Sequence, residues 1–163
     1  MIKISHISMD NPLYEQEVAL RTSVLLDPIG FTFDDYLGMA PGREEESEHY
    51  VATLDHPTGI KVVGTATLFI SEDNQGQRTG KVQQVCVDPQ RQGEGIGRRL
   101  MIAMEARGFG ELGLEQLYCH AQLSAMPFYE RLGWQSEDEV FVEAGIEHKR
   151  MYISAPKPVD QER

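Results

Sequence analysis

The segment VQQVCVDPQRQGEGIGRRLM, residues 82–101, places glycines at positions 93, 95 and 97 between an apolar run and an amphipathic run. Glycine is unfavourable within helices, so three glycines where a helix should begin need a separate reason. A strand followed by a glycine-rich turn and a helix N-terminus suits an anion, because free N–H groups and the helix dipole both favour negative charge. Glycines also lack the Cβ atoms that would hold a phosphate away. The segment therefore predicts a strand, a phosphate-binding turn and a helix.

Apolar periodicity along the rest of the chain predicts an α/β protein, with a mixed sheet and helices on its faces. The predicted order of elements is β, α, β, β, β, α, β, α, β, β. Strands are expected at residues 2–7, 49–54, 60–70, 81–87 and 114–121, then as a pair within 134–154 around a turn at Ala144 and Gly145. Helices are expected from Pro12 to about Leu26, from about Gly95 to a C-cap at Gly108, and over 124–133 with Ser124 as the N-cap.

Two stretches outside these elements are polar. Residues 28–48 predict an irregular segment with one short helical turn near Phe33–Leu37, and the acidic run Glu44–Glu48 is interpreted as a solvated loop. The end of the chain is rich in proline and charge, so residues 155–163 are predicted to be a disordered tail. The sequence has no internal repeat and no linker, and residues 1–154 are therefore expected to form a single domain.

Composition argues against several classes of protein. The chain of 163 residues is 40% hydrophobic and 25% charged, which is ordinary for a soluble domain. No apolar run reaches the roughly 20 residues that cross a bilayer, and the first residues lack a signal-peptide pattern, so a cytoplasmic protein without a membrane partner is expected. The formal charge of −11 argues against nucleic acid as a partner. It fits an amine-bearing substrate, and it fits solubility equally well.

The two cysteines of the chain, Cys86 and Cys119, lie in apolar strand-like runs. Such positions are typical of reduced, buried thiols in a reducing compartment. Neither a CxxC pair nor clustered histidines accompany them, so no metal site is predicted.

Two phosphate-binding patterns compete for the glycine segment. In a dinucleotide fingerprint, GxGxxG, Gly93 and Gly95 match, but the third glycine falls at 97 rather than 98. The acidic residue expected about 20 positions further on, Glu115, lies at the start of a strand rather than at its end. In the other pattern, Gln/Arg-x-x-Gly-x-Gly/Ala, residues 92–97 fit and the chain continues as an amphipathic helix. This segment resembles the pyrophosphate-binding loop of the GNAT superfamily of acyl-CoA-dependent N-acetyltransferases.

Four further segments resemble the same superfamily, in order and at compatible spacing. HAQLSAMPFYERLGW, residues 120–134, is similar to the block that follows the glycine loop. Three others resemble elements of an ElaA-like branch: ALRTSVLLDPIG at 19–30, EEESEHYVA at 44–52 and FVEAGIEHKRM at 141–151. The resemblance covers nearly the whole chain to Tyr152.

The resemblance implies the GNAT fold, a mixed and mostly antiparallel twisted sheet of about seven strands with splayed middle strands, flanked by about four helices. It implies transfer of an acetyl group from acetyl-CoA to a primary amine of a small molecule, peptide or protein by direct attack in a ternary complex. It implies no metal, and it allows a homodimer, which is frequent in the family. The alternative is a catalytically weak acyl-CoA-binding sensor or partner module with the same fold.

The resemblance also implies how the cofactor is held. Pantetheine would pair with the main chain of the strand before the glycine loop, with Val87 nearest the thioester, where an amide N–H can stabilise an oxyanion. Amides of Gln92–Arg98 would hold the pyrophosphate. Gln122 stands where many relatives carry Asn, and its amide can still donate to the cofactor arm. The cofactor-binding residues so implied are Val85, Cys86, Val87, Gln92, Gly93, Glu94, Gly95, Ile96, Gly97, Arg98, Gln122 and Tyr129.

Tyr129 matches the family's tyrosine near the sulfur of coenzyme A. A phenol within hydrogen-bond reach can protonate the leaving thiolate, although a tyrosine at this position of a helix can also belong to the core. A nucleophilic Cys119–His120 pair is a third interpretation, but no partnering carboxylate spacing supports it.

The sequence does not single out one residue as the base that deprotonates the amine. Gln83 occupies the position of a strand-borne Glu in some relatives, and it cannot act as a base. The remaining candidates are His120 and His148, each of which can work through a water chain or can be purely structural. Glu147 replaces the usual Pro before His148, which puts the conformation of that loop in doubt.

Overall fold

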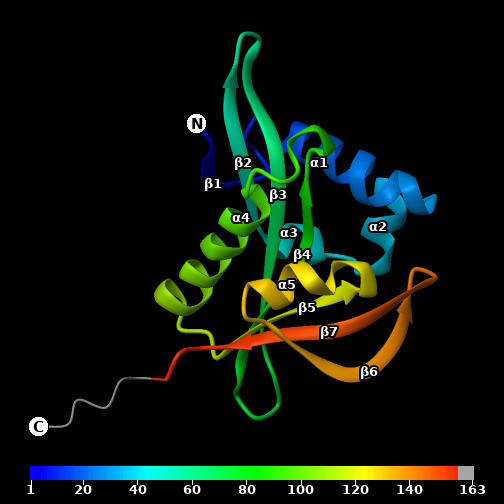
Figure 1. The fold of residues 1–163 in the computed structure, drawn as a ribbon, viewed down its shortest axis with the longest axis vertical. Helices are drawn as coiled ribbons and strands as arrows, with labels where there is room; N and C mark the ends of the chain where they lie inside the picture. The colour runs from blue at the N-terminus through cyan, green and yellow to red at the C-terminus, as the bar shows by residue number, and fades with distance from the viewer. Residues whose placement is uncertain (158–163) are drawn as a thin grey trace, which may run out of the picture. The chain divides into compact units, whose positions relative to one another are not determined.

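The computed structural model describes residues 1–157, which form two compact units. The first unit comprises residues 1–70 and 81–104, and the second comprises 71–80 and 105–157. Within the described residues, seven strands follow the order β1-β2-β3-β4-β5-β7-β6 in a mixed α/β fold (Figure 1). The predicted fold class is therefore confirmed. The single domain at 1–154 stays a prediction, and residues 158–163 of the predicted tail lie outside the described residues.

The strands are β1 (Lys3–Ile7), β2 (Glu48–His56), β3 (Gly59–Glu72), β4 (Arg78–Val87), β5 (Gln116–Gln122), β6 (Gln135–Glu143) and β7 (Ile146–Ser154). The α-helices are α1 (Tyr14–Arg21), α2 (Phe33–Met39), α3 (Arg43–Glu46), α4 (Ile96–Glu105) and α5 (Met126–Arg131). Short turns of 3₁₀-helix or π-helix extend several of them. Among residues 1–157, no helix combines the length and apolar character needed to cross a membrane.

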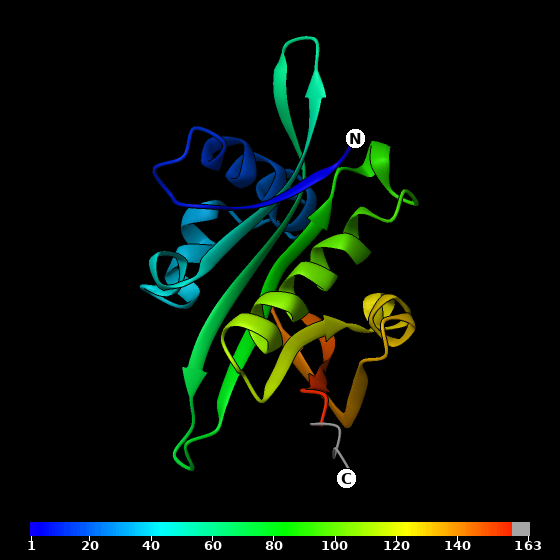
Figure 2. The ribbon, with the colours of Figure 1, turned by 90° about the vertical axis from the view of Figure 1, so that its left-hand side faces the viewer.

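In the first unit, α1 and α4 cover opposite faces of the strands (Figure 2). Leu13 and Leu20, before and within α1, pack on a cluster that includes Val51 of β2. On the other face, a Cβ atom added to Gly64 of β3 would lie 3.0 Å from side-chain atoms of both Ile96 and Leu100. The absence of a side chain at Gly64 thus allows α4, which follows the glycine loop, to approach the sheet closely.

Gly64→Ala is expected to destabilise the protein by about 1–3 kcal/mol, because a well-packed contact must open to admit the methyl group. The measurement is the free energy of unfolding from urea titration. Gly38→Ala is the matched control, since Gly38 lies within α2 and an added Cβ there meets no atom within 4 Å. Alanine favours a helix over glycine, so the control should be neutral or slightly stabilising. Equal effects of the two substitutions would contradict the role given to Gly64.

In the second unit, β7 lies between β5 and β6 and is antiparallel to both. Leu117, Cys119 and Ala121 of β5 are buried and alternate with partly buried or exposed residues. The predicted C-cap at Gly108 is wrong, because the helix continues as a π-helical turn over Ala106–Glu111. Gly108 is buried there, and an added Cβ would lie 2.9 Å from Leu117. This glycine therefore serves packing rather than helix termination.

Two helix starts also differ from the prediction. Helix α1 begins at Tyr14 rather than Pro12, and it continues as a π-helical turn to Leu26, where the predicted helix ends. Ser124 does not cap α5, because it lies in the 3₁₀ turn Leu123–Ala125 and the N-cap position is Ala125. Proline and serine at such positions mark a helix start only to within a few residues.

The segment 28–48 is more regular than predicted. It holds α2, whose N-cap Thr32 forms a capping box with Asp35, and it also holds α3. The acidic run was interpreted as a solvated loop, which is wrong at Glu44, because that residue is only 3% exposed.

Candidate functional site

The predicted phosphate loop lies between β4 and α4 in the first unit. After Val87, the carboxylate of Asp88 accepts a hydrogen bond from the Gln90 N–H at 2.9 Å and starts a 3₁₀ turn. Gly93 and Gly95 follow with φ angles of 86° and 79°, in the left-handed region that favours glycine. Two of the three glycines are thus required by the backbone conformation.

The loop is open to solvent. Residues 92–95 are exposed, and an added Cβ at Gly93 or Gly95 would meet no atom within 4 Å. The N–H of Arg99 bonds the carbonyl of Gly95 at 3.1 Å, at the first turn of α4. The first N–H groups of a helix have no partner within the helix, so those of this loop are available to an anion.

Strand β4 carries a left-handed residue directly before the segment Val85–Val87. Gln84 has a φ angle of 54°, a conformation that bends a strand and redirects the main chain after it. The Thr65 hydroxyl donates to the Gln84 carbonyl at 2.7 Å, and the Arg21 Nε donates to the Gln84 side-chain oxygen at 3.0 Å. These bonds hold the bend that positions the main chain of Val85–Val87.

The side chains around this bend are also fixed. The side-chain oxygen of Gln83 accepts a hydrogen bond from Arg43 Nη1 at 3.1 Å, which fixes the orientation of the Gln83 side chain. Cys86 is buried with its sulfur 3.1 Å from the Thr65 hydroxyl. Burial raises the pKa of the Cys86 thiol to about 11.

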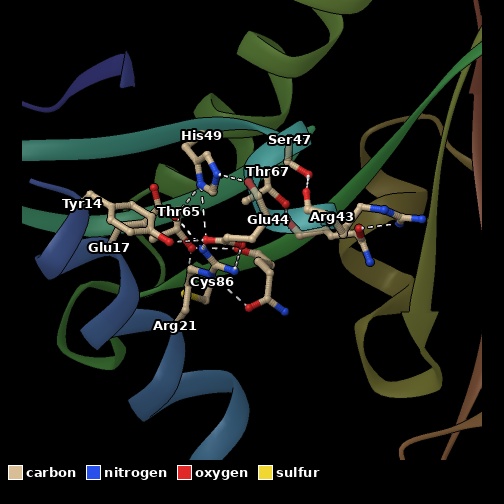
Figure 3. A network of polar contacts seen from close by, with 12 residues as sticks. Tyr14, Glu17, Arg21, Arg43, Glu44, Ser47, His49, Thr65, Thr67 and Cys86 are labelled. Atoms are coloured by element: carbon tan, nitrogen blue, oxygen red, sulfur yellow. Dashed lines mark hydrogen bonds and ion pairs between the residues drawn. The ribbon is translucent and has the colours of Figure 1, made fainter. Parts of the chain in front are cut away.

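A buried cluster of ionisable residues contacts the bend at Gln84 through Arg21 (Figure 3). This ion cluster consists of Glu17, Arg21, Glu44 and His49. Arg21 Nη1 lies 2.7 Å from Glu17 Oε2 and 2.8 Å from Glu44 Oε2, and Arg21 Nη2 lies 2.8 Å from Glu44 Oε1. His49 Nδ1 lies 2.8 Å from Glu17 Oε2. All four side chains are almost completely buried.

The charges of the ion cluster compensate one another. Burial raises the pKa of Glu44, but the hydrogen bond and charge of Arg21 outweigh it and leave that pKa below its ordinary value. Burial lowers the pKa of His49, but the hydrogen bond and charge of Glu17 outweigh it and raise that pKa above its ordinary value. Ligand atoms of Glu17, Glu44 and His49 lie within 4.8 Å of one another, as in a metal site. The Arg21 guanidinium already bonds both carboxylates, and the arrangement is that of an internal ion pair.

The sequence interpretation missed this cluster. Its one local signal is Glu17, which falls among the apolar positions of α1 and is four residues before Arg21. The third member, Glu44, is distant in sequence from Glu17 and Arg21. It lies in an acidic run whose composition predicts a solvated loop.

In the second unit, Tyr129 of α5 is 8% exposed. Its ring lies 5.0 Å from that of Phe128 and 5.5 Å from that of Trp134, measured between centroids. Burial, with a hydrogen bond to Cys119, raises the pKa of Tyr129 well above its ordinary value. The phenol therefore keeps its proton at neutral pH and is available as a proton donor.

Both candidate histidines lie on the face of the sheet away from Tyr129, His120 on β5 and His148 on β7. His120 and Gln122 alternate with the buried Cys119, so they lie on the face away from Tyr129. His148 of β7 is aligned with Gln122 on that face, since the two are register partners. The same alternation separates the side chains of Cys119 and His120, which disfavours a nucleophilic pair.

Glu143, at the end of β6, lies between the two histidines. Its Oε1 is 3.0 Å from His120 Nδ1, and its Oε2 is 4.0 Å from His148 Nε2. The Phe141 ring contacts both imidazoles, edge-on to His120 at 4.9 Å and stacked on His148 at 5.8 Å. The sequence interpretation did not include Glu143. Strand alternation through the turn at Ala144 and Gly145 would have placed it on the face of His148.

Comparisons with known proteins agree with one another. The family model described as an acetyltransferase (GNAT) domain matches residues 32–155. A candidate acetyltransferase of Bacillus subtilis is 34% identical over 132 residues, which are 81% of this chain and 83% of that protein. The Escherichia coli ElaA structure has a TM-score of 0.72 at 18% identity, covering 93% of this chain and 99% of ElaA. An aminoglycoside 6′-N-acetyltransferase complexed with coenzyme A has a TM-score of 0.72 at 18% identity, covering 96% and 99% of the two chains.

Proposed function

Because the chain belongs to the GNAT family of acetyltransferases, we propose that it transfers an acetyl group from acetyl-CoA to a primary amine by direct attack in a ternary complex. The observation that carries the proposal is the exposed loop after β4, with left-handed Gly93 and Gly95 at the start of α4. An open, glycine-rich loop at a helix N-terminus suits the diphosphate of coenzyme A. Tyr129 and the histidines of the second unit supply the groups for the chemistry.

The proposed cofactor contacts are mostly main-chain contacts. The N–H groups of Gln92–Arg98 bind the pyrophosphate, because they lie at a helix N-terminus. The main chain of Val85–Val87 pairs with pantetheine, and the Val87 N–H faces the thioester oxygen. The amide of Gln122 donates to the cofactor arm. The bend at Gln84 supports this assignment, since it changes the direction of the main chain just before Val85.

In the proposed reaction, the amine nitrogen attacks the thioester carbonyl, a C–N bond forms and the C–S bond breaks. The electron pair of the broken bond goes to sulfur, which takes a proton from Tyr129. The nitrogen loses its proton to a histidine base, directly or through water. The location of Tyr129 and the histidines on opposite faces of the β5–β7 pair supports separate roles as acid and base.

The proposed acceptor is a small-molecule amine. The structural neighbour named for aminoglycosides acts on such a class, and the formal charge of −11 is compatible with a cationic substrate. A peptide or protein amine is the alternative acceptor. Release of free coenzyme A with a panel of aminoglycosides, polyamines and basic peptides distinguishes them.

A second candidate function is an acyl-CoA-binding sensor without catalysis. The observation in its favour is Gln83, which stands in place of a carboxylate and is bound to Arg43. Calorimetric binding of acetyl-CoA together with no thiol release for any amine would support the sensor. Absence of binding to coenzyme A and its thioesters would contradict both functions.

Gly95→Ala is expected to weaken coenzyme A binding by about tenfold, because the left-handed conformation costs an alanine roughly 1–2 kcal/mol and the loop relaxes away from it. The measurement is the dissociation constant by calorimetry. Gly76→Ala is the matched control, since Gly76 has a similar φ of 80° in the turn between β3 and β4. The control should lose stability but bind coenzyme A normally. Equal loss of binding in both variants would remove the loop from the proposed site.

A further inference from the structure

We propose that Glu143 is a positioning residue that makes His120, rather than His148, the base for the amine. The inference deepens the proposed function and rests on it. It selects one of two histidines and adds a carboxylate to the site.

The contact between Glu143 and His120 fixes the tautomer of the imidazole. A carboxylate accepts hydrogen bonds, so the 3.0 Å contact from Glu143 Oε1 requires the proton on His120 Nδ1. The lone pair of the neutral ring then lies on Nε2. A carboxylate in this position also stabilises the imidazolium that forms when Nε2 takes up a proton. His120 is thereby prepared to act as a base.

His148 is held in a different way. Its Nδ1 is 2.7 Å from the Ile146 carbonyl oxygen, so that nitrogen also carries the proton. Its Nε2 faces Glu143 at 4.0 Å, and the side chain is only 8% exposed. A proton on this Nε2 would be enclosed between the carboxylate and the stacked Phe141 ring. His148 is therefore enclosed, while His120, with 26% of its side chain exposed, is the ring open to a substrate.

The charged residue paired with His120 across the sheet, Arg150, bonds other side chains. Arg150 of β7 is the register partner of His120, and it bonds Glu137 of β6 and Gln116 of β5 at 2.8 and 2.7 Å. The Arg150 guanidinium also lies over the Tyr118 ring at 4.4 Å. Glu143 is thus the carboxylate that bonds His120, and its other oxygen lies 4.0 Å from His148 Nε2.

In the proposed step, His120 Nε2 accepts a proton from the ammonium form of the substrate, directly or through one water. The N–H bond breaks as the nitrogen lone pair becomes available for attack on the thioester. The imidazolium returns its proton to solvent after the product leaves. No oxidant, reductant or metal ion takes part in this step.

The test compares Glu143→Gln with Glu137→Gln, a substitution on the same strand that removes a carboxylate bonded to Arg150. Two measurements are made on each protein: the pH profile of kcat/KM with the best amine found, and the tautomer of each histidine by long-range ¹H–¹⁵N NMR. In Glu143→Gln, kcat/KM should fall by about 10–100-fold. The acid limb of the profile should change, because the substitution removes the carboxylate that bonds Nδ1 of the base. His120 should lose its fixed Nδ1–H tautomer, and coenzyme A affinity should not change.

The outcomes separate this inference from the function on which it rests. Normal acetyl transfer with an unchanged pH profile and tautomer in Glu143→Gln would overturn the role of Glu143 and leave the function intact. Loss of the acid limb in His148→Gln but not in His120→Gln would assign the base to His148 and overturn the inference. Binding of acetyl-CoA without transfer to any amine would overturn the proposed function, and the base with it.

Discussion

Tyr129→Phe is expected to lower kcat by about 10²-fold or more, with little change in the affinity for acetyl-CoA. The substitution removes only the hydroxyl group, so the ring contacts with Phe128 and Trp134 persist and the fold should be kept. Without the phenol, the thiolate leaves the tetrahedral intermediate unprotonated, which raises the barrier to C–S cleavage. The measurements are thiol release under saturating substrates and calorimetric binding of acetyl-CoA.

Tyr152→Phe is the matched control for this experiment. The Tyr152 hydroxyl bonds Gln135 at 3.1 Å in an exposed position on β7, and we assign it no part in catalysis. Its loss should leave kcat unchanged. If kcat of Tyr129→Phe stays within twofold of the unsubstituted enzyme, Tyr129 is a core tyrosine and another group protonates the sulfur.

Arg21→Met is expected to destabilise the protein by about 3–5 kcal/mol, because it leaves two buried carboxylates side by side without their cation. The measurement is the free energy of unfolding at pH 7. Arg107→Met is the control, since Arg107 forms a pair of the same spacing with Glu111, whose side chain is 64% exposed. An exposed pair is worth about 1 kcal/mol or less. A similar small loss for Arg21→Met would mean that the ion cluster adds little to stability.

The contribution of Glu44 to the pH dependence of stability should have opposite signs in Arg21→Met and in the unsubstituted protein. Arg21 holds the pKa of Glu44 below its ordinary value, so this contribution to stability is present above the ordinary carboxyl pKa and is lost as pH falls through the lowered one. In the variant, burial acts on Glu44 without the guanidinium and raises its pKa. The stability of the variant relative to the unsubstituted protein should therefore rise as pH falls from 7 towards 5, because the raised pKa of His49 acts in both proteins and the change at Glu44 acts only in the variant.

Local patterns were sufficient to predict most of the fold and part of the candidate site. The strand, loop and helix around residues 82–105 were predictable because apolar periodicity, turn glycines and helix propensity agree there. The hairpin at Ala144 and Gly145 was predictable for the same reason, and both residues have left-handed φ angles. These features depend on neighbours in sequence.

The errors concern residues whose environment is set by distant parts of the chain. The composition of the run Glu44–Glu48 predicts a solvated loop. Burial of Glu44 is favourable only because Arg21 of α1 bonds its carboxylate. The position of Gly108 in the sequence predicts a helix C-cap. Its close approach to Leu117 shows instead that a glycine is needed there for packing. Glu143 lies directly before the predicted turn at Ala144 and Gly145, and its role depends on a side chain of β5, 23 positions earlier.

The buried thiol of β4 has a consequence for a protein that handles thioesters. A thiolate beside a bound acyl-CoA would be acylated by exchange, and the modified cysteine would block the site. With a pKa of about 11, Cys86 has a thiolate fraction of about 10⁻⁴ at neutral pH. Its sulfur also points at Thr65, within the interior of the first unit. The strand can therefore carry a cysteine and still resist self-modification for as long as the chain stays folded.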